Sequence, residues 1–130
     1  MSGNRFKLVL TGFLLFATLG VANVSAKSFW TRPDVSGDIT LSELPPQGQE
    51  THRLIYQGGP FPFDKDGVVF GNRERLLPMN KRGYYREYTV RTPGSRDRGA
   101  KRIVCGGAAT MPDACFYSAD HYASFRKIVP

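Results

Sequence analysis

Two stretches of alternating residues, joined by a tight turn, most constrain the fold of this chain. Residues 84–91, YYREYTVR, alternate so that Tyr88 and Val90 point to one face and Glu87 points to the other. The sequence TPGS follows, with its proline and glycine placed as in a type II turn. A period of two on either side of such a turn predicts an antiparallel hairpin.

The second half of the hairpin is AKRIVCG, which places Ile103 and Cys105 on one face and Arg102 and Val104 on the other. Further strands are expected in three short apolar segments. These segments are GVVF at 67–70, CFYS at 115–118 and YASFRKIV at 122–129.

A helix is expected before the strands, within LSELPPQGQETHRLIYQGG. Pro46 suits the first helical turn, Leu54 and Ile55 form the apolar side, and Gly58-Gly59 ends the helix. Residues 27–38 are expected to be an extended, loosely held arm. The predicted class is therefore α+β, with one main helix packed on one face of a small, mostly antiparallel sheet and the other face free.

The N-terminus has the pattern of a secretory signal peptide. Arg5 and Lys7 precede an uncharged run at 8–22, and the small residues Val24-Ser25-Ala26 suit signal peptidase. We predict that residues 1–26 are removed and that residues 27–130 form one exported domain. The run is too short for a stable membrane span, so no membrane association is expected after cleavage. The pattern leaves the periplasm and the extracellular space open.

The exported chain of 104 residues is basic, because 16 Lys and Arg face 11 Asp and Glu, a net charge of +5. Such an excess of cations favours polyanions as partners, whether nucleic acid, an anionic membrane surface or an acidic protein. Charge alone does not choose among them.

Two cysteines remain in the exported chain. In an oxidising compartment Cys105 and Cys115 are expected to pair, the alternative being two free thiols. The short loop would contribute about 2.5–3 kcal/mol in the chain-entropy model. A zinc site is not expected, because there is no CxxC motif and only His52 and His121 are available.

The free face of the sheet is expected to carry a set of side chains that could act in catalysis. Glu87 and Arg102 can share a face of the hairpin, Arg98 lies in its turn, and His121 precedes the last strand. RNA brings its own nucleophile, the 2′-hydroxyl. A carboxylate can act as base, an imidazolium as acid, and guanidiniums can hold the phosphate charge. No tight carboxylate cluster suggests Mg²⁺, so no metal or other cofactor is predicted.

Each of these residues has a simpler interpretation. Glu87 can be half of a surface ion pair, His121 can be structural, and Arg98 and Arg102 can be solvated. The competing function is a non-catalytic basic module that holds RNA, an anionic glycan or an acidic partner. Such a module has no use for Glu87 and His121 together.

Three motifs in order, GPFPFDKDGVVFGNRE, YYREYTVRTPGSRDRGAKRIV and DHYASF, resemble the small bacterial guanyl-specific ribonucleases of the barnase group. The similarity runs from about Asp34 to Ile128 and is greatest for the secreted streptomycete-type branch. It implies that Glu87 is the general base and His121 the general acid. It also implies that Arg98 and Arg102 bind the scissile phosphate, and that RNA is cleaved 3′ of guanosine through a 2′,3′-cyclic phosphate.

The resemblance also makes residues 70–74, FGNRE, the recognition loop for guanine. Glu74 would accept hydrogen bonds from guanine, backbone N–H groups of Asn72 and Arg73 would point at its O6, and Phe70 would stack on the ring. Glu74 can instead pair with a neighbouring arginine. Tyr122 would line the phosphate site or serve only as a sheet aromatic.

The family further implies a small acidic inhibitor of the barstar type. The sequence leaves the oligomeric state open, and a monomer is the default expectation. Two departures from the family pattern stand out. Gly71 replaces a side chain in the recognition loop, which predicts a looser loop or weaker guanine preference. Relatives often join their N- and C-terminal ends by a disulfide, whereas this chain offers only Cys105 and Cys115. His52 matches nothing catalytic and is expected on the surface.

Overall fold

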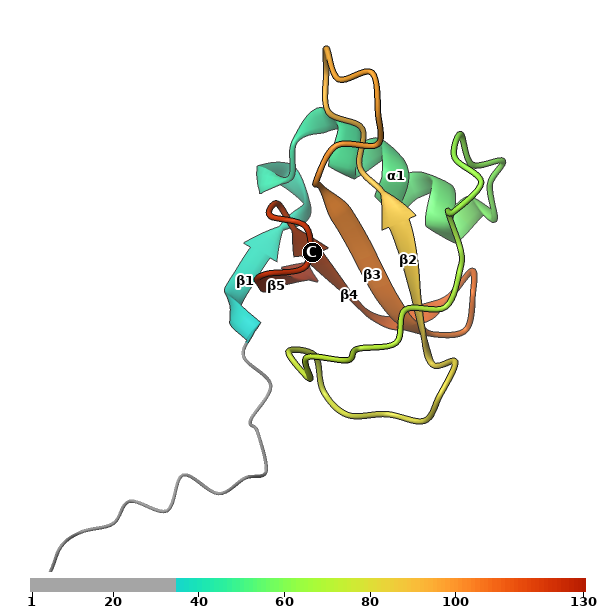
Figure 1. The fold of residues 1–130 in the computed structure, drawn as a ribbon, viewed down its shortest axis with the longest axis vertical. Helices are drawn as coiled ribbons and strands as arrows, with labels where there is room; N and C mark the ends of the chain where they lie inside the picture. The colour runs from blue at the N-terminus through green and yellow to red at the C-terminus, as the bar shows by residue number, and fades with distance from the viewer. Residues whose placement is uncertain (1–34) are drawn as a thin grey trace, which may run out of the picture.

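One five-stranded sheet with a helix against it makes up residues 35–130, the part of the chain that the computed structural model describes (Figure 1). The elements in chain order are β1 (Val35–Thr40), the 3₁₀ helix η1 (Leu41–Glu43), α1 (Pro46–Gln57), β2 (Tyr85–Thr89), β3 (Arg102–Gly107), β4 (Pro112–Ser118) and β5 (Phe125–Val129). The strand order is β1-β5-β4-β3-β2, and every neighbouring pair is antiparallel except β1 with β5. The predicted α+β class is confirmed. The predicted signal peptide and residues 27–34 lie outside the described residues.

Helix α1 begins and ends where the sequence predicts. Pro46 is its first residue, where a missing N–H costs nothing, and Gly58 ends it in the left-handed conformation at φ 85°. Ile55 is 1% exposed and packs toward the sheet. The Thr51 hydroxyl is within 3.0 Å of both the Gln47 and Thr89 carbonyl oxygens, so a hydrogen-bonding side chain also attaches the helix to β2.

The pleat of the sheet separates two apolar clusters. Ile103 and Cys105 face α1 together with Tyr88 and Val90, as the alternation predicts. Val104 faces the other way. There it joins a second cluster whose members come from both the sheet and the long loop before β2, namely Leu77, Tyr85, Phe116 and Phe125.

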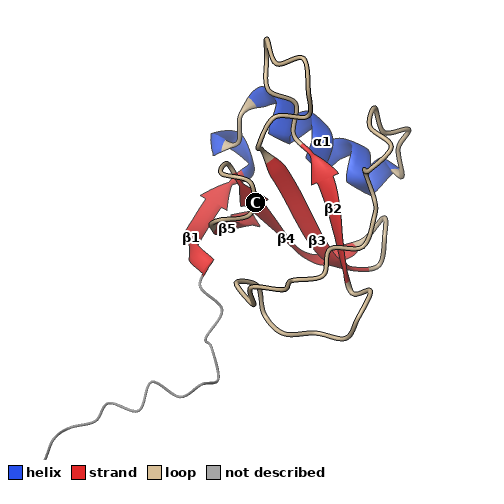
Figure 2. Cartoon of the chain, in the orientation of Figure 1, coloured by secondary structure: helices blue, strands red, loops and turns tan. Residues whose placement is uncertain are grey.

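The second cluster corrects the expectation of a free face. The segment between α1 and β2 contains no regular element (Figure 2), yet it covers the part of the sheet near Tyr85. Only the other end of that face remains polar, where Glu87, Thr89 and Arg102 lie on neighbouring strands.

Several expected boundaries were wrong. The strand expected at 115–118 already begins at Pro112, and the tight turn expected between the first two strands is part of a longer connection from Thr89 to Arg102. Residues 67–70 form an isolated bridge between Val69 and Arg86 rather than a strand. The arm predicted over residues 27–38 overlaps β1, which begins at Val35 because its backbone pairs with β5. The last strand starts at Phe125 and not at Tyr122, since Tyr122 has a positive φ of 69° that no strand accommodates.

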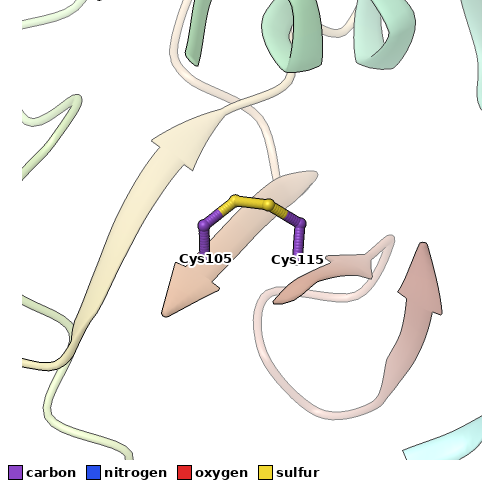
Figure 3. The surroundings of a disulfide bond; sticks show 2 residues. All are labelled: Cys105 and Cys115. Atoms are coloured by element: carbon purple, nitrogen blue, oxygen red, sulfur yellow. A yellow bond between two sulfur atoms is a disulfide. The ribbon is translucent and has the colours of Figure 1, made fainter. Parts of the chain in front are cut away.

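The predicted disulfide is present and joins adjacent strands (Figure 3). Cys105 in β3 and Cys115 in β4 lie directly opposite each other in the antiparallel ladder. Both are buried in the cluster beneath α1. The bond therefore links the two strands whose paired ends, Arg102 and Ser118, lie next to the turn that carries His121.

Replacing both cysteines by alanine should lower the free energy of unfolding by about 2–4 kcal/mol, since the unfolded chain loses its short closed loop and the core loses packing. Urea denaturation of the exported domain, followed by far-UV circular dichroism, measures the difference. An unchanged midpoint would contradict a stabilising role for this bond.

Candidate active site

A cleft of about 660 Å³ opens beside β2, on the sheet face opposite α1. Its walls include the loop of residues 70–74 together with Glu87, His121 and Tyr122. The structure thus brings together the carboxylate, the imidazole and the loop that the sequence singled out. Arg98 and Arg102 reach the same place through their contacts with Glu87 and Tyr122.

Glu87 occupies the centre of this arrangement. Its side chain is 11% exposed, and its Oε1 lies 3.5 Å from a terminal nitrogen of Arg98. Its Oε2 accepts a hydrogen bond from the Tyr122 hydroxyl. The backbone of Glu87 makes two hydrogen bonds to the loop before β2. Its carbonyl accepts from the Gly67 N–H, and its N–H donates to the Val68 carbonyl. The carboxylate is therefore held in position and is partnered by a cation and a hydroxyl.

The two arginines differ in environment. Arg98 is partly exposed and donates from Nε to the Thr89 hydroxyl at 2.9 Å. Arg102 is 3% exposed; its Nε lies 3.2 Å from the Tyr122 hydroxyl, and another nitrogen donates to the Lys101 carbonyl at 2.8 Å. Burial, and then the nearby charge of Arg98, lower the pKa of the Arg102 guanidinium. Two cations held this close favour an anion between or above them.

His121 lies in the exposed turn between β4 and β5. Both His121 and Tyr122 have left-handed backbones, at φ 53° and 69°. Asp120 stabilises the turn by accepting hydrogen bonds from the Ser118 hydroxyl at 2.9 Å, the Ser124 N–H at 2.9 Å and the Ser124 hydroxyl at 2.6 Å. The His121 N–H also bonds to the Ala100 carbonyl. The imidazole is thus presented to the cleft by a turn that is bonded on both sides.

The recognition loop is closed by the side chain of Asn72. Its amide nitrogen donates to the Leu77 carbonyl at 3.0 Å and its amide oxygen accepts from the Leu77 N–H at 3.1 Å. Phe70 stacks on Tyr122 with ring centroids 5.0 Å apart. Glu74 lines the cleft. The ion pairs among residues 35–130 are Glu50–Arg53 and Glu87–Arg98, so the alternative pairing of Glu74 with a loop arginine is not observed there.

Sequence reasoning missed the residues that hold the site in shape. Asp120 and Ser124 were not recognised, although Asp and Ser are both residue types that favour turns. The dual bond from Asn72 to Leu77 was also missed, because its partner is five positions away in an irregular loop. Asp66 binds the Thr89 N–H at 2.7 Å and was likewise not singled out.

Chemically, the set can move protons and hold a phosphate. One carboxylate and one imidazole line a single cleft, with two guanidiniums beside the carboxylate. No group of three metal-ligating side chains occurs among residues 35–130. An RNA phosphodiester supplies its own nucleophile and fits a base, an acid and a cationic clamp.

Comparison with known proteins gives one consistent family. The model of the ribonuclease family matches residues 31–129. Guanyl-specific ribonuclease Sa from Kitasatospora aureofaciens is 55% identical over 73% of this chain and 96% of its own. Guanyl-specific ribonuclease St from Saccharopolyspora erythraea is 50% identical over 74% of this chain and 93% of its own.

Solved structures agree. Ribonuclease Sa2, in complexes with mononucleotides, is 47% identical with a TM-score of 0.69, over 76% of this chain and 98% of its own. The same enzyme with guanosine-2′-cyclophosphate is 48% identical with a TM-score of 0.66, over 72% of this chain and 97% of its own.

Replacing Asp120 by Ala should destabilise the protein by about 1–2 kcal/mol at neutral pH, because the turn loses its acceptor. The bond from the Ser124 hydroxyl is the main cause that lowers the pKa of Asp120 below its usual 3.8. A lowered folded-state pKa stabilises the protein above the usual value, and the effect is lost as pH falls through the lowered one. The difference between wild type and variant should therefore shrink toward pH 2 in urea titrations. Asp64→Ala, at an exposed carboxylate with no side-chain hydrogen bond among residues 35–130, is the control. A difference independent of pH would contradict this role.

Proposed function

The chain belongs to the ribonuclease family, and on that premise we propose that it is an exported endoribonuclease that cleaves single-stranded RNA 3′ of guanosine. One observation carries the catalytic assignment. Glu87 is a nearly buried carboxylate in contact with Arg98 and Tyr122, in the same cleft as His121. If Glu87 and Arg98 formed only a surface ion pair, neither the nearby imidazole nor the closed loop of residues 70–74 would be required.

In the first step Glu87 is the general base. It takes the proton of the 2′-hydroxyl, and the 2′-oxygen forms a bond to phosphorus while the bond to the 5′-oxygen breaks. His121, protonated, gives its proton to the leaving 5′-oxygen. The product is a 2′,3′-cyclic phosphate on guanosine. Tyr122 yields its bond to Glu87 when the substrate hydroxyl arrives, and then donates to the phosphate instead.

Arg98 and Arg102 stabilise the charge that gathers on the phosphate oxygens. Arg102 is oriented by bonds to the Lys101 carbonyl and Tyr122, so little rearrangement is needed when the transition state forms. Arg98 lies over Glu87 and Thr89 and can turn one nitrogen to the phosphate. Both remain cationic at neutral pH.

In the second step the cyclic phosphate is hydrolysed to a 3′-phosphate. His121, now neutral, takes a proton from water as the oxygen attacks phosphorus. Glu87, now protonated, returns its proton to the 2′-oxygen as that bond breaks. Both groups end in the states in which they began, which closes the cycle.

Guanine selection is assigned to the recognition loop. Glu74 accepts hydrogen bonds from the N1–H and the exocyclic amine of guanine. Adenine does not offer this pair of donors. The N–H groups of Asn72 and Arg73 make no hydrogen bond within residues 35–130, and they are free to meet O6. The Asn72 side chain, bonded to Leu77, supports this shape. Phe70 stacks on the base. Gly71 has room for a side chain, since a Cβ atom added there would have only Arg73 within 4 Å, so the missing side chain loosens the loop.

The partners follow from the charge. RNA is the substrate, and an acidic inhibitor of the barstar type would cover the cationic cleft by electrostatic complementarity. The exported domain acts as a monomer outside the cytoplasm. No helix among residues 35–130 combines the length and apolar character that crossing a membrane requires.

Glu87→Gln should lower kcat for GpU cleavage by about 10²–10⁴, because the amide cannot accept the 2′ proton. Rates are measured with the exported domain in chelator, across pH. Wild type should show a bell-shaped profile, because the reaction needs an ionised general base and a protonated general acid. Glu50→Gln, at an exposed helical pair with Arg53, is the matched control and should retain wild-type rates.

If Glu87→Gln cleaves GpU at a near-normal rate and its pH–rate profile still falls at low pH, the assignment of Glu87 as general base is wrong. No turnover by folded wild-type protein would leave the alternative function, a basic binding module without catalysis.

Glu74→Ala should reduce the preference for GpU over ApU by about 10–100-fold in kcat/KM, since two charge-assisted hydrogen bonds are lost. Cleavage of ApU should change little. Glu43→Ala, next to Thr40 and away from the cleft, is the control. If wild type cleaves GpU and ApU equally fast, the assignment of Glu74 fails while the nuclease assignment stands.

A further inference from the structure

Thr89 is the last residue of β2, and the two catalytic steps give it no role. It is 2% exposed, lies two positions after Glu87 on the same face of the sheet, and pairs with Arg102 in the ladder to β3. Its hydroxyl oxygen accepts a hydrogen bond from Nε of Arg98 at 2.9 Å. A buried hydroxyl therefore lies among the carboxylate and the two guanidiniums of the cleft.

Three segments of the chain hold Thr89 in place. Its N–H donates to the Asp66 carboxylate at 2.7 Å, and its carbonyl accepts from the Thr51 hydroxyl of α1 at 3.0 Å. Its backbone also pairs with Arg102 of β3. Because the backbone is bonded to the loop before β2, to the helix and to the next strand, the fold itself sets the position of the Thr89 hydroxyl.

Arg98, in contrast, comes from a less constrained segment. Residues 93–97, which precede it in the connection between β2 and β3, are exposed. An arginine side chain loses much rotamer entropy when it is held in one geometry, so its orientation requires a support. Its terminal nitrogen lies 3.5 Å from Oε1 of Glu87, at the outer limit of a hydrogen bond. The 2.9 Å bond to Thr89 is the shorter of these two side-chain contacts.

The bond at Nε leaves the outer edge of the guanidinium available for a ligand. A guanidinium has five N–H donors, and Nε carries only one of them. In the first catalytic step Glu87 takes a proton and loses its charge, so its attraction for Arg98 weakens. The bond to the neutral hydroxyl of Thr89 does not depend on that charge. Arg98 therefore keeps its orientation while negative charge gathers on the phosphate.

We propose that Thr89 is a positioning residue for RNA cleavage, and that its hydroxyl holds the Arg98 guanidinium in the orientation that the transition state requires. This role rests on the proposed function, because it needs Arg98 at the scissile phosphate. A cation that is already oriented needs little rearrangement when the transition state forms. The contribution of Thr89 is therefore expected in kcat rather than in KM.

Thr89→Val removes the hydroxyl and keeps a β-branched side chain of similar size. It should lower kcat for GpU cleavage by the exported domain about tenfold, the effect of losing one hydrogen bond to a charged group, with a much smaller change in KM. Thr89→Ser keeps the acceptor and should stay within about twofold of wild type. Thr40→Val, the same substitution at the end of β1, is the matched control and should leave kcat unchanged.

A double-mutant cycle with Arg98→Ala separates positioning from a general structural effect. If Thr89 acts through Arg98, Thr89→Val should cost less than about twofold in the Arg98→Ala background, since no guanidinium remains to be oriented. An equal loss from Thr89→Val in both backgrounds would overturn the proposal. An unchanged kcat for Thr89→Val, or the same loss for Thr89→Ser, would also overturn it.

A measurement on the wild-type protein keeps the proposal testable if Thr89→Val does not fold. In NMR spectra of the nitrogen-labelled protein, the Arg98 Nε–H should exchange slowly with water, and this protection should persist when guanosine 3′-monophosphate is bound. Rapid exchange in the bound state would overturn the proposal, because Nε would then have no bond to Thr89. Failure of the wild-type protein to cleave GpU would instead overturn the proposed function, so the two failures are distinguishable.

Discussion

A carboxylate that is almost buried on a sheet face must find partners, and the site is assembled around this requirement at Glu87. Leaving such a charge unpaired is far more costly than losing an ordinary hydrogen bond. Its partners come from segments distant in sequence, Arg98 from the loop between β2 and β3 and Tyr122 from the turn before β5. Tyr122 also contacts Arg102, so its hydroxyl connects the Glu87 carboxylate with the buried guanidinium. The contacts that stabilise the folded chain are therefore the same contacts from which the proposed catalytic site is built.

Packing beneath the recognition loop decides where that loop lies. Phe70, Tyr122 and Phe125 are in contact through their rings, and the loop residue Leu77 is buried in the same cluster. The segment before β2 has no regular structure, yet its apolar residues attach it to the sheet. A loop held in this way can present backbone N–H groups to a base without much reordering, which lowers the entropic cost of binding.

The ends of the domain are joined without a covalent bond. In the family that the sequence resembles, a disulfide often connects them, whereas here β1 pairs in parallel with β5 and Arg126 donates to the Asp38 carbonyl at 2.8 Å. The disulfide instead links β3 and β4 beneath α1. Its constraint therefore acts on the strands that carry Arg102 and lead to His121, rather than on the termini.

Features that depend on neighbours along the chain could be predicted from the amino-acid sequence, whereas features that depend on distant segments required the folded structure. The alternation around Glu87 and Arg102 predicted their common face, Pro46 and Gly58 marked the helix ends, and a turn forms at Pro93-Gly94 within the longer connection between β2 and β3, with Gly94 at φ 79°. These follow from local backbone geometry, which a few adjacent residues decide.

The distant contacts changed the expected strand at 67–70 into a single bridge, started β1 at Val35, and placed a loop over part of the face expected to be free. They also include the bond from the Thr89 N–H to Asp66, which attaches the loop before β2 to the sheet. The partners in these contacts lie in turns and on edge strands, where pairing depends on which distant segment packs alongside. The local pattern of apolar residues cannot predict which distant segment packs alongside, because the free energy that favours one pairing arises only when the two segments are in contact.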